Sequence, residues 1–124
     1  MSDNTKHPIL PVPCELDRQL WEYSERIERV RRDLLTMQWQ FSELQGAPES
    51  MAVDSLGEPI DPQQATERVL TALVAADAAL GATADTLSGA RRYSNRLKLT
   101  DAAAEVREQR LTAAKRRQRS DRSR

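Results

Sequence analysis

The sequence predicts an all-α protein: a long, coiled-coil-like antiparallel helical hairpin, a short third helix and a disordered basic C-terminal tail. Apolar residues recur at alternating intervals of four and three along two long segments, which is typical of a helix that packs along another helix. Charged residues make up 31% of the 124 residues, a share that favours exposed long helices over a compact globule. The chain is therefore expected to be one domain with flanking tails.

The predicted boundaries follow from prolines, glycines and helix-capping residues. Residues 1–13 are expected to be a disordered, proline-rich lead-in, because proline favours extended backbone before and around it. Residues 14–99 form the helical hairpin, within which residues 46–61 are the connecting loop. Residues 100–117 form the third helix, and residues 118–124 are the disordered basic tail.

The first predicted helix runs from about residue 14 to residue 45. Pro13 suits the first turn of a helix and Glu15 follows where the helix dipole favours an acid. Gly46 suits the left-handed position after a helix, and Pro48 blocks its continuation. A helix of this length, about 48 Å at 1.5 Å per residue, cannot bury its own apolar face and needs a partner helix. That face consists of Leu16, Leu20, Tyr23, Ile27, Val30, Leu34, Met37, Phe41 and Leu44.

The loop is long for a helical hairpin and is expected to be a solvated linker, or else to fold over the end of the hairpin. The second helix begins with Asp61 as N-cap, Pro62 in the first helical position and Gln64 where a capping box needs it. Its apolar face is rich in small residues, which permits close approach of another helix. That face consists of Val69, Leu73, Ala76, Leu80, Thr83, Leu87 and Ala90.

The two apolar faces fit each other when the helices run antiparallel. The facing pairs, whose residue numbers sum to 106 or 107, include Leu34 with Leu73, Ile27 with Leu80, and Leu20 with Leu87. A shift of one heptad is nearly as good, so the antiparallel direction is the firmer prediction. In the alternative, a parallel dimer of the first helix, Arg26 would face Arg31 of the second copy, and this like-charge contact disfavours it.

Thr100 and Asp101 indicate the start of a third helix. Its apolar content is thin, and alone it would be marginal. It is therefore expected to pack on the hairpin, to continue from the second helix, or to become ordered only on a partner.

Three large apolar residues, Trp21, Leu35 and Trp39, lie off the apolar face of the first helix. Against a single partner helix they would be exposed, so a second contact is expected. The favoured interpretation is that another segment of the same chain covers them. The alternative is that they bind a second subunit or another protein.

Charge is distributed unevenly along a chain whose net charge is zero. Residues 1–90 carry 7 Lys/Arg and 15 Asp/Glu, whereas residues 91–124 carry 12 Lys/Arg and 4 Asp/Glu. Such a basic region could contact an acidic protein, or the phosphates of nucleic acid without base-specific readout. The residues expected to make these contacts are Arg91, Arg92, Arg96, Arg107, Arg110, Lys115, Arg116, Arg117, Arg119, Arg122 and Arg124.

Enzymatic chemistry is not expected. His7 is the single histidine and Cys14 the single cysteine, and no phosphate-binding glycine loop, nucleophile motif or zinc-ligand spacing occurs. We therefore expect no catalytic residue, no metal, no cofactor and no small-molecule substrate. The function expected is that of a non-enzymatic protein–protein interaction or adaptor module that also assembles with itself, a dimer being favoured. The alternative is a sequence-nonspecific nucleic-acid-binding accessory protein.

A cytoplasmic location is expected. The first residues lack a basic start followed by an apolar run, and a lone cysteine suits a reducing compartment. The longest apolar-rich tract, Val69 to Leu87, contains Asp77 and Asp85, so we expect no membrane span.

Overall fold

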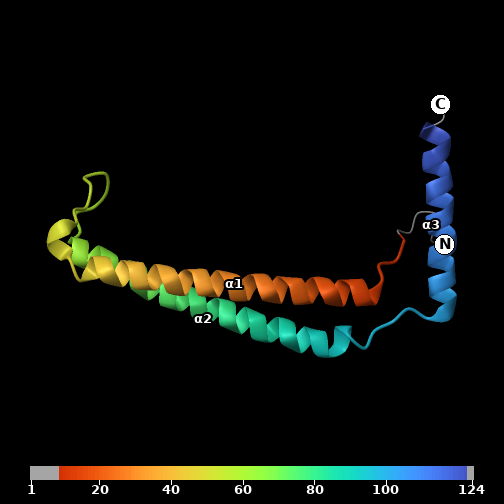
Figure 1. The fold of residues 1–124 in the computed structure, drawn as a ribbon, viewed down its shortest axis with the longest axis horizontal. Coiled ribbons are helices and arrows are strands. Elements are labelled where there is room, and N and C mark those ends of the chain that lie inside the picture. The colour runs from red at the N-terminus through yellow and green to blue at the C-terminus, as the bar shows by residue number, and fades with distance from the viewer. Residues whose placement is uncertain (1–8, 123–124) are drawn as a thin grey trace. The chain divides into compact units, whose positions relative to one another are not determined.

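The structure, a computed structural model, describes residues 9–122. Within this range it contains three α-helices, one short 3-10 helix and no strand (Figure 1), which confirms the all-α class. The elements are α1 (Pro13–Gln45), η2 (Pro48–Ser50), α2 (Pro62–Ser94) and α3 (Asp101–Arg122).

The chain divides into two compact units, and the sequence did not predict this division. The central unit is Leu20–Ala90 and contains most of α1 and α2. The terminal unit combines the residues up to Gln19 with those from Arg91 onward, so it holds the first turns of α1, the last turn of α2, and α3.

Helix α1 begins as predicted but ends differently. The backbone N–H groups of Glu15 and Leu16 donate to the carbonyl of Val12, at 3.1 and 3.2 Å. At the other end, the prediction of a left-handed Gly46 is wrong, because none of the glycines in the described range has a positive φ. The helix instead tightens: Ala47 N–H donates to the carbonyl of Leu44 at 3.0 Å, three residues back, and the short helix η2 follows.

In the central unit α1 and α2 lie side by side (Figure 1), and an ion pair joins them. Arg31 Nε of α1 lies 2.9 Å from Asp77 Oδ1 of α2. The less exposed stripe of α1 alternates apolar and polar side chains. Its members are Leu20, Ser24, Ile27, Arg31, Leu34, Gln38 and Phe41.

This stripe covers only half of the predicted apolar face. Tyr23, Val30, Met37 and Leu44 were expected to face α2, yet their side chains remain exposed. The ion pair gives the physical reason, because Arg31 can reach Asp77 only if its side of α1 faces α2. In that orientation the neighbouring column of α1, which begins at Tyr23, points away from α2. We call Tyr23, Val30, Met37 and Leu44 the outer column.

The described residues contain no fully buried hydrophobic side chain. The one buried residue is Thr66, whose hydroxyl donates to the carbonyl of Pro62 at 2.8 Å and also contacts Met51 Sδ at 3.9 Å. The loop therefore folds against the start of α2 at Met51, whereas Leu56 at its tip is 91% exposed. It follows that the central unit alone has little apolar burial to stabilise it.

The predicted start of α2 is confirmed: the Asp61 carboxylate accepts a hydrogen bond from the backbone N–H of Gln63 at 3.2 Å. By length and composition alone, α2 is long and apolar enough to cross a membrane. From the sequence, no membrane span was expected in this segment, and one such helix is only weak support for a span. Asp77, in the middle of this helix, pairs with Arg31.

Two glycines inside α2 have different surroundings and give a stability prediction. A Cβ added at Gly81 would lie 3.2 Å from the guanidinium carbon of Arg31, whereas one added at Gly89 would meet nothing within 4 Å. Replacing Gly89 by alanine should raise the free energy of unfolding by about 1 kcal/mol, the difference in helix propensity. Gly81→Ala should raise the free energy of unfolding by clearly less, because the Arg31 side chain must move to make room for the added Cβ. Urea unfolding of both variants measures the difference, and equal gains would contradict it.

In the terminal unit, Thr100 caps α3 as predicted: its hydroxyl accepts from the backbone N–H of Ala103 at 3.1 Å. The helix continues to Arg122, so the prediction of disorder from residue 118 is wrong for residues 118–122. Residues 123–124 lie outside the described range. Arg119 and Arg122 occupy the last turn, where the helix dipole favours cations. Arg107 Nε donates to the carbonyl of Leu10 at 2.8 Å, which attaches the lead-in to α3.

Candidate functional site

The first polar cluster lies in the central unit, where α1 and α2 meet. The Arg31 guanidinium donates to both Asp77 carboxylate oxygens, at 2.9 and 3.4 Å, and to Glu28 at 3.3 Å. The hydrogen bond from Arg31 lowers the pKa of Asp77, and the same contact raises the pKa of Arg31. This arrangement keeps both charges satisfied, and it fixes the relative rotation of the two helices rather than offering a reactive group.

The second polar cluster lies in the terminal unit and links the start of α1 to the end of α2. The Asp17 carboxylate accepts two hydrogen bonds from Arg91, both at 3.3 Å, and one from the Ser94 hydroxyl at 2.5 Å. The hydrogen bonds from Arg91 and then Ser94 lower the pKa of Asp17. Arg91, a predicted contact for an acidic partner, therefore already has an acidic partner within its own chain.

These two aspartates make stability depend on pH. The pKa values of both carboxyls are lowered in the folded state. Their contribution to the free energy of unfolding is therefore fully present above the ordinary aspartate pKa of about 3.9, and it is lost as the pH falls from there toward the lowered pKa. We expect the free energy of unfolding to fall over this window, as measured by urea unfolding between pH 6 and pH 2.5. Asp77→Asn should reduce that fall. The control Asp85→Asn, at an exposed position of the same helix, should leave it unchanged. Equal pH profiles for all three proteins would contradict the expectation.

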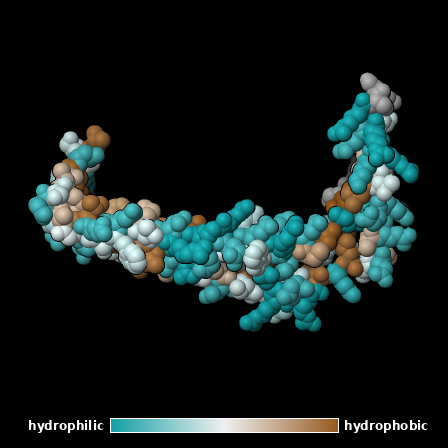
Figure 2. All heavy atoms as spheres, in the orientation of Figure 1, coloured by the Kyte–Doolittle hydropathy of each residue, from teal (hydrophilic) through white to brown (hydrophobic). Residues whose placement is uncertain are grey.

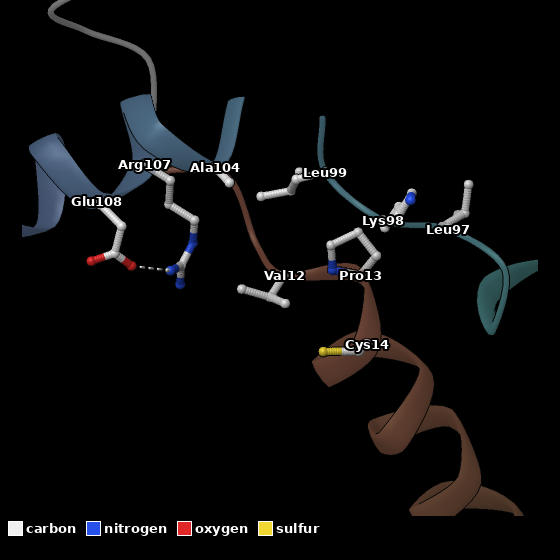
Figure 3. A pocket seen from close by; sticks show the side chains of 9 residues that line it. All are labelled: Val12, Pro13, Cys14, Leu97, Lys98, Leu99, Ala104, Arg107 and Glu108. Carbon is white, nitrogen blue, oxygen red and sulfur yellow. Dashed lines mark ion pairs between the residues drawn. The ribbon is translucent and has the colours of Figure 1, made fainter. Parts of the chain in front are cut away.

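The terminal unit also contains an apolar pocket of about 310 Å³ (Figure 3). Three segments that are distant in sequence build it: the start of α1, the connection before α3, and the first turns of α3. An ion-pair contact of 3.9 Å between Arg107 Nη1 and Glu108 Oε1 borders it. The lining residues are Val12, Pro13, Cys14, Leu97, Lys98, Leu99, Ala104, Arg107 and Glu108.

This pocket suits an apolar side chain better than a reacting substrate. Its walls are mainly apolar, and Cys14 contributes a free and exposed thiol to them. Sequence reasoning missed the pocket. Leu97 and Leu99, which follow the end of α2, were the available signal, but nothing in the sequence placed them beside Val12. In the described range, no group of three or more His, Cys, Asp or Glu side chains could hold a metal ion.

The predicted apolar site residues are all exposed, and no segment of the central unit covers them. Trp39 is 68% exposed, and Trp21 and Leu35 are about half exposed. The loop, one of the segments that could cover them, folds against the start of α2 instead. Leu35 shares a shallow hollow with Val74 of α2, whereas Trp21 lies in a separate hollow with charged residues of α1.

The predicted basic residues divide into two groups. Arg91 and Arg107 make contacts within the terminal unit, as described above, and Arg110 lines a second hollow beside Leu10. The other described members are exposed at the end of α2, in the connection, or on the last turns of α3. They are Arg92, Arg96, Lys115, Arg116, Arg117, Arg119 and Arg122. Arg124 lies outside the described residues, as does His7.

Figure 2 shows the hydropathy of one face of the molecule. Hydrophilic side chains predominate over the visible face of α1 and α2, with hydrophobic patches between them, and hydrophobic side chains gather beside the first half of α3. No protein-family model, curated protein or solved structure matches this chain.

Proposed function

We propose that the protein is a non-enzymatic helical interaction or adaptor module. It assembles through an antiparallel hairpin of α1 and α2, and it contacts an acidic protein with the basic end of α3. The observation that carries the proposal is that the described residues include no fully buried hydrophobic side chain, although apolar columns follow the length of α1. Such helices need a partner surface to complete a core.

The hairpin is supported by the two polar clusters. The residue numbers of Arg31 and Asp77 sum to 108, and so do those of Asp17 and Arg91. The sum for each pair lies next to the 106 or 107 expected from the apolar faces. Within each unit, a charge-assisted contact thus favours the same antiparallel pairing of α1 with α2 that the facing leucines predict.

The binding role is supported by the exposed cations of α3. Five of its last eight residues, from Lys115 to Arg122, are basic and exposed, with Asp121 the one acid among them. A helix presents such side chains around its surface without apolar neighbours, so attraction to an acidic partner is mainly long-range and falls with salt. We further propose a cytoplasmic protein that forms dimers and needs no membrane, cofactor or small-molecule substrate.

The alternative, a nucleic-acid-binding accessory protein, is favoured by one specific feature. Tyr93 is 70% exposed between Arg92 and Arg96, and an aromatic ring among cations can stack on the bases of a single strand. This arrangement would add to phosphate contacts from α3.

The test replaces the five α3 cations by glutamine in the full-length chain: Lys115, Arg116, Arg117, Arg119 and Arg122. The probes are labelled poly-glutamate, a DNA duplex and a DNA single strand, each titrated at several salt concentrations. We expect poly-glutamate binding to weaken by roughly tenfold or more at low salt. The control, Arg29→Gln with Arg32→Gln, removes exposed cations of α1 and should bind normally. Binding of DNA but not poly-glutamate would favour the alternative, and binding of neither would contradict both.

A further inference from the structure

We propose that the outer column of α1 joins two copies of this chain, with their α1 helices antiparallel and a two-fold axis at Val30. The proposal rests on the assembly role proposed above, for which it supplies the surface and the geometry. Tyr23, Val30, Met37 and Leu44 recur every seven residues, and their side chains are 51%, 45%, 41% and 45% exposed. This is the spacing with which one helix keeps a continuous face toward another.

A second copy fits this column because its charges complement themselves. By helical periodicity, the column is flanked on the side away from α2 by Gln19, Arg26, Asp33 and Gln40. Arg26 and Asp33 are opposite charges one heptad apart. When two α1 helices run antiparallel about Val30, facing residues have numbers that sum to about 60. Arg26 then lies opposite Asp33 of the second copy, and symmetry repeats the pair.

The apolar contacts follow from the same register. Val30 meets Val30 of the second copy on the axis, and Tyr23 meets Met37 of the second copy on either side. Arg26 is already held at the edge of the column, because its guanidinium carbon lies 5.4 Å from the centre of the Tyr23 ring. Each contact therefore combines an apolar layer with a charge pair at its border.

A parallel dimer lacks this complementarity. In that arrangement the two-fold axis runs along the helices, and it places the flank of Arg26 and Asp33 opposite the column of Ile27 and Leu34 in the second copy. Both charges would then face apolar side chains without an ionic partner. The sequence of α1 thus favours the antiparallel direction over the parallel one.

The antiparallel axis also completes a core. It is perpendicular to the helices, so both copies of α2 lie on the same side of the α1 pair. The four helices then form a bundle, an arrangement that antiparallel helix pairs commonly adopt. The column of Leu20, Ile27, Leu34 and Phe41 lies between α2 and the outer column, and it would point to the bundle centre. This accounts for the lack of a fully buried hydrophobic side chain among the described residues of a single copy.

Cysteine crosslinking in the full-length chain tests the geometry, with Cys14→Ser as the background. Val30→Cys should form a covalent dimer on mild oxidation, because position 30 lies on the axis. Tyr23→Cys alone should not, but a mixture of Tyr23→Cys and Met37→Cys chains should crosslink as a heterodimer. Efficient crosslinking of Tyr23→Cys alone would show a parallel arrangement and overturn the proposal.

Charge exchange tests the proposed pair independently, with dimerisation measured by sedimentation equilibrium. Arg26→Asp and Asp33→Arg should each weaken the dimer by roughly tenfold or more, and the double exchange should restore most of the affinity. A chain that is monomeric at all concentrations, or a double exchange no better than the single ones, would overturn the proposal. Poly-glutamate binding by the same variants distinguishes this failure from that of the proposed function, because the α3 cations remain intact.

Discussion

Replacing Leu34 by aspartate is expected to unfold the central unit at 25 °C. Leu34 lies on the stripe of α1 that faces α2, and it is less exposed than its neighbours Asp33 and Leu35. The substitution removes an apolar contact worth about 1.5–3 kcal/mol when fully buried. It also places a carboxylate between two helices, where desolvation costs several kcal/mol more. A unit without a fully buried hydrophobic side chain has little stability to absorb this loss.

The helical signal in circular dichroism measures the result, followed through a urea titration. Thr36→Asp provides the control, because Thr36 is two residues further along the same helix and is exposed. A surface substitution of this kind usually changes stability by less than about 0.5 kcal/mol. If Leu34→Asp were as stable as Thr36→Asp, the assignment of the stripe that faces α2 would be wrong.

The helices themselves could be predicted from the sequence because their signals are local. Pro13, Asp61 and Thr100 act within one turn of their own position, and the structure uses all three as expected. Gly46 shows the limit of such reasoning. Glycine permits a left-handed ending but does not require it, and the chain instead ends α1 with a tighter turn that leads into η2.

The orientation of α1 was harder to predict, because apolar spacing defines two neighbouring columns without saying which one faces α2. The decision depends on Arg31 and Asp77, which are 46 residues apart in sequence. Arg31 lies outside the predicted apolar face, so the apolar spacing did not place it beside α2. A glycine at position 81, beside the Arg31 guanidinium, was the available signal that this side of α1 approaches α2.

The candidate sites depend still more on contacts between distant segments. Asp17 and Arg91 are 74 residues apart, and the apolar pocket joins Val12 to Leu99. No spacing rule connects such positions. The basic character of α3, in contrast, follows from composition alone, but its helicity beyond residue 117 does not. Composition indicated disorder there, whereas the structure continues the helix to Arg122.

Replacing Val30 and Met37 together by glutamate is expected to give a monomer that is much less stable than the wild-type chain. In the proposed bundle, both side chains are covered by the second copy, and each contributes up to about 1.5–3 kcal/mol. The glutamate at position 30 would also face its own copy across the axis, which is a like-charge contact. At about 4 °C per kcal/mol for a chain of this size, the Tm should fall by roughly 10 °C.

Concentration dependence separates this effect from a simple loss of helix propensity. Because association stabilises the folded chain, the wild-type Tm should rise by about 3 °C for each tenfold increase in concentration, whereas that of the double variant should stay constant. The control adds two glutamates on exposed positions outside the column, Thr36→Glu with Ser42→Glu, and should keep the wild-type dependence. A wild-type Tm that is independent of concentration, together with an unchanged Tm in the Val30 and Met37 variant, would mean that the outer column faces only water.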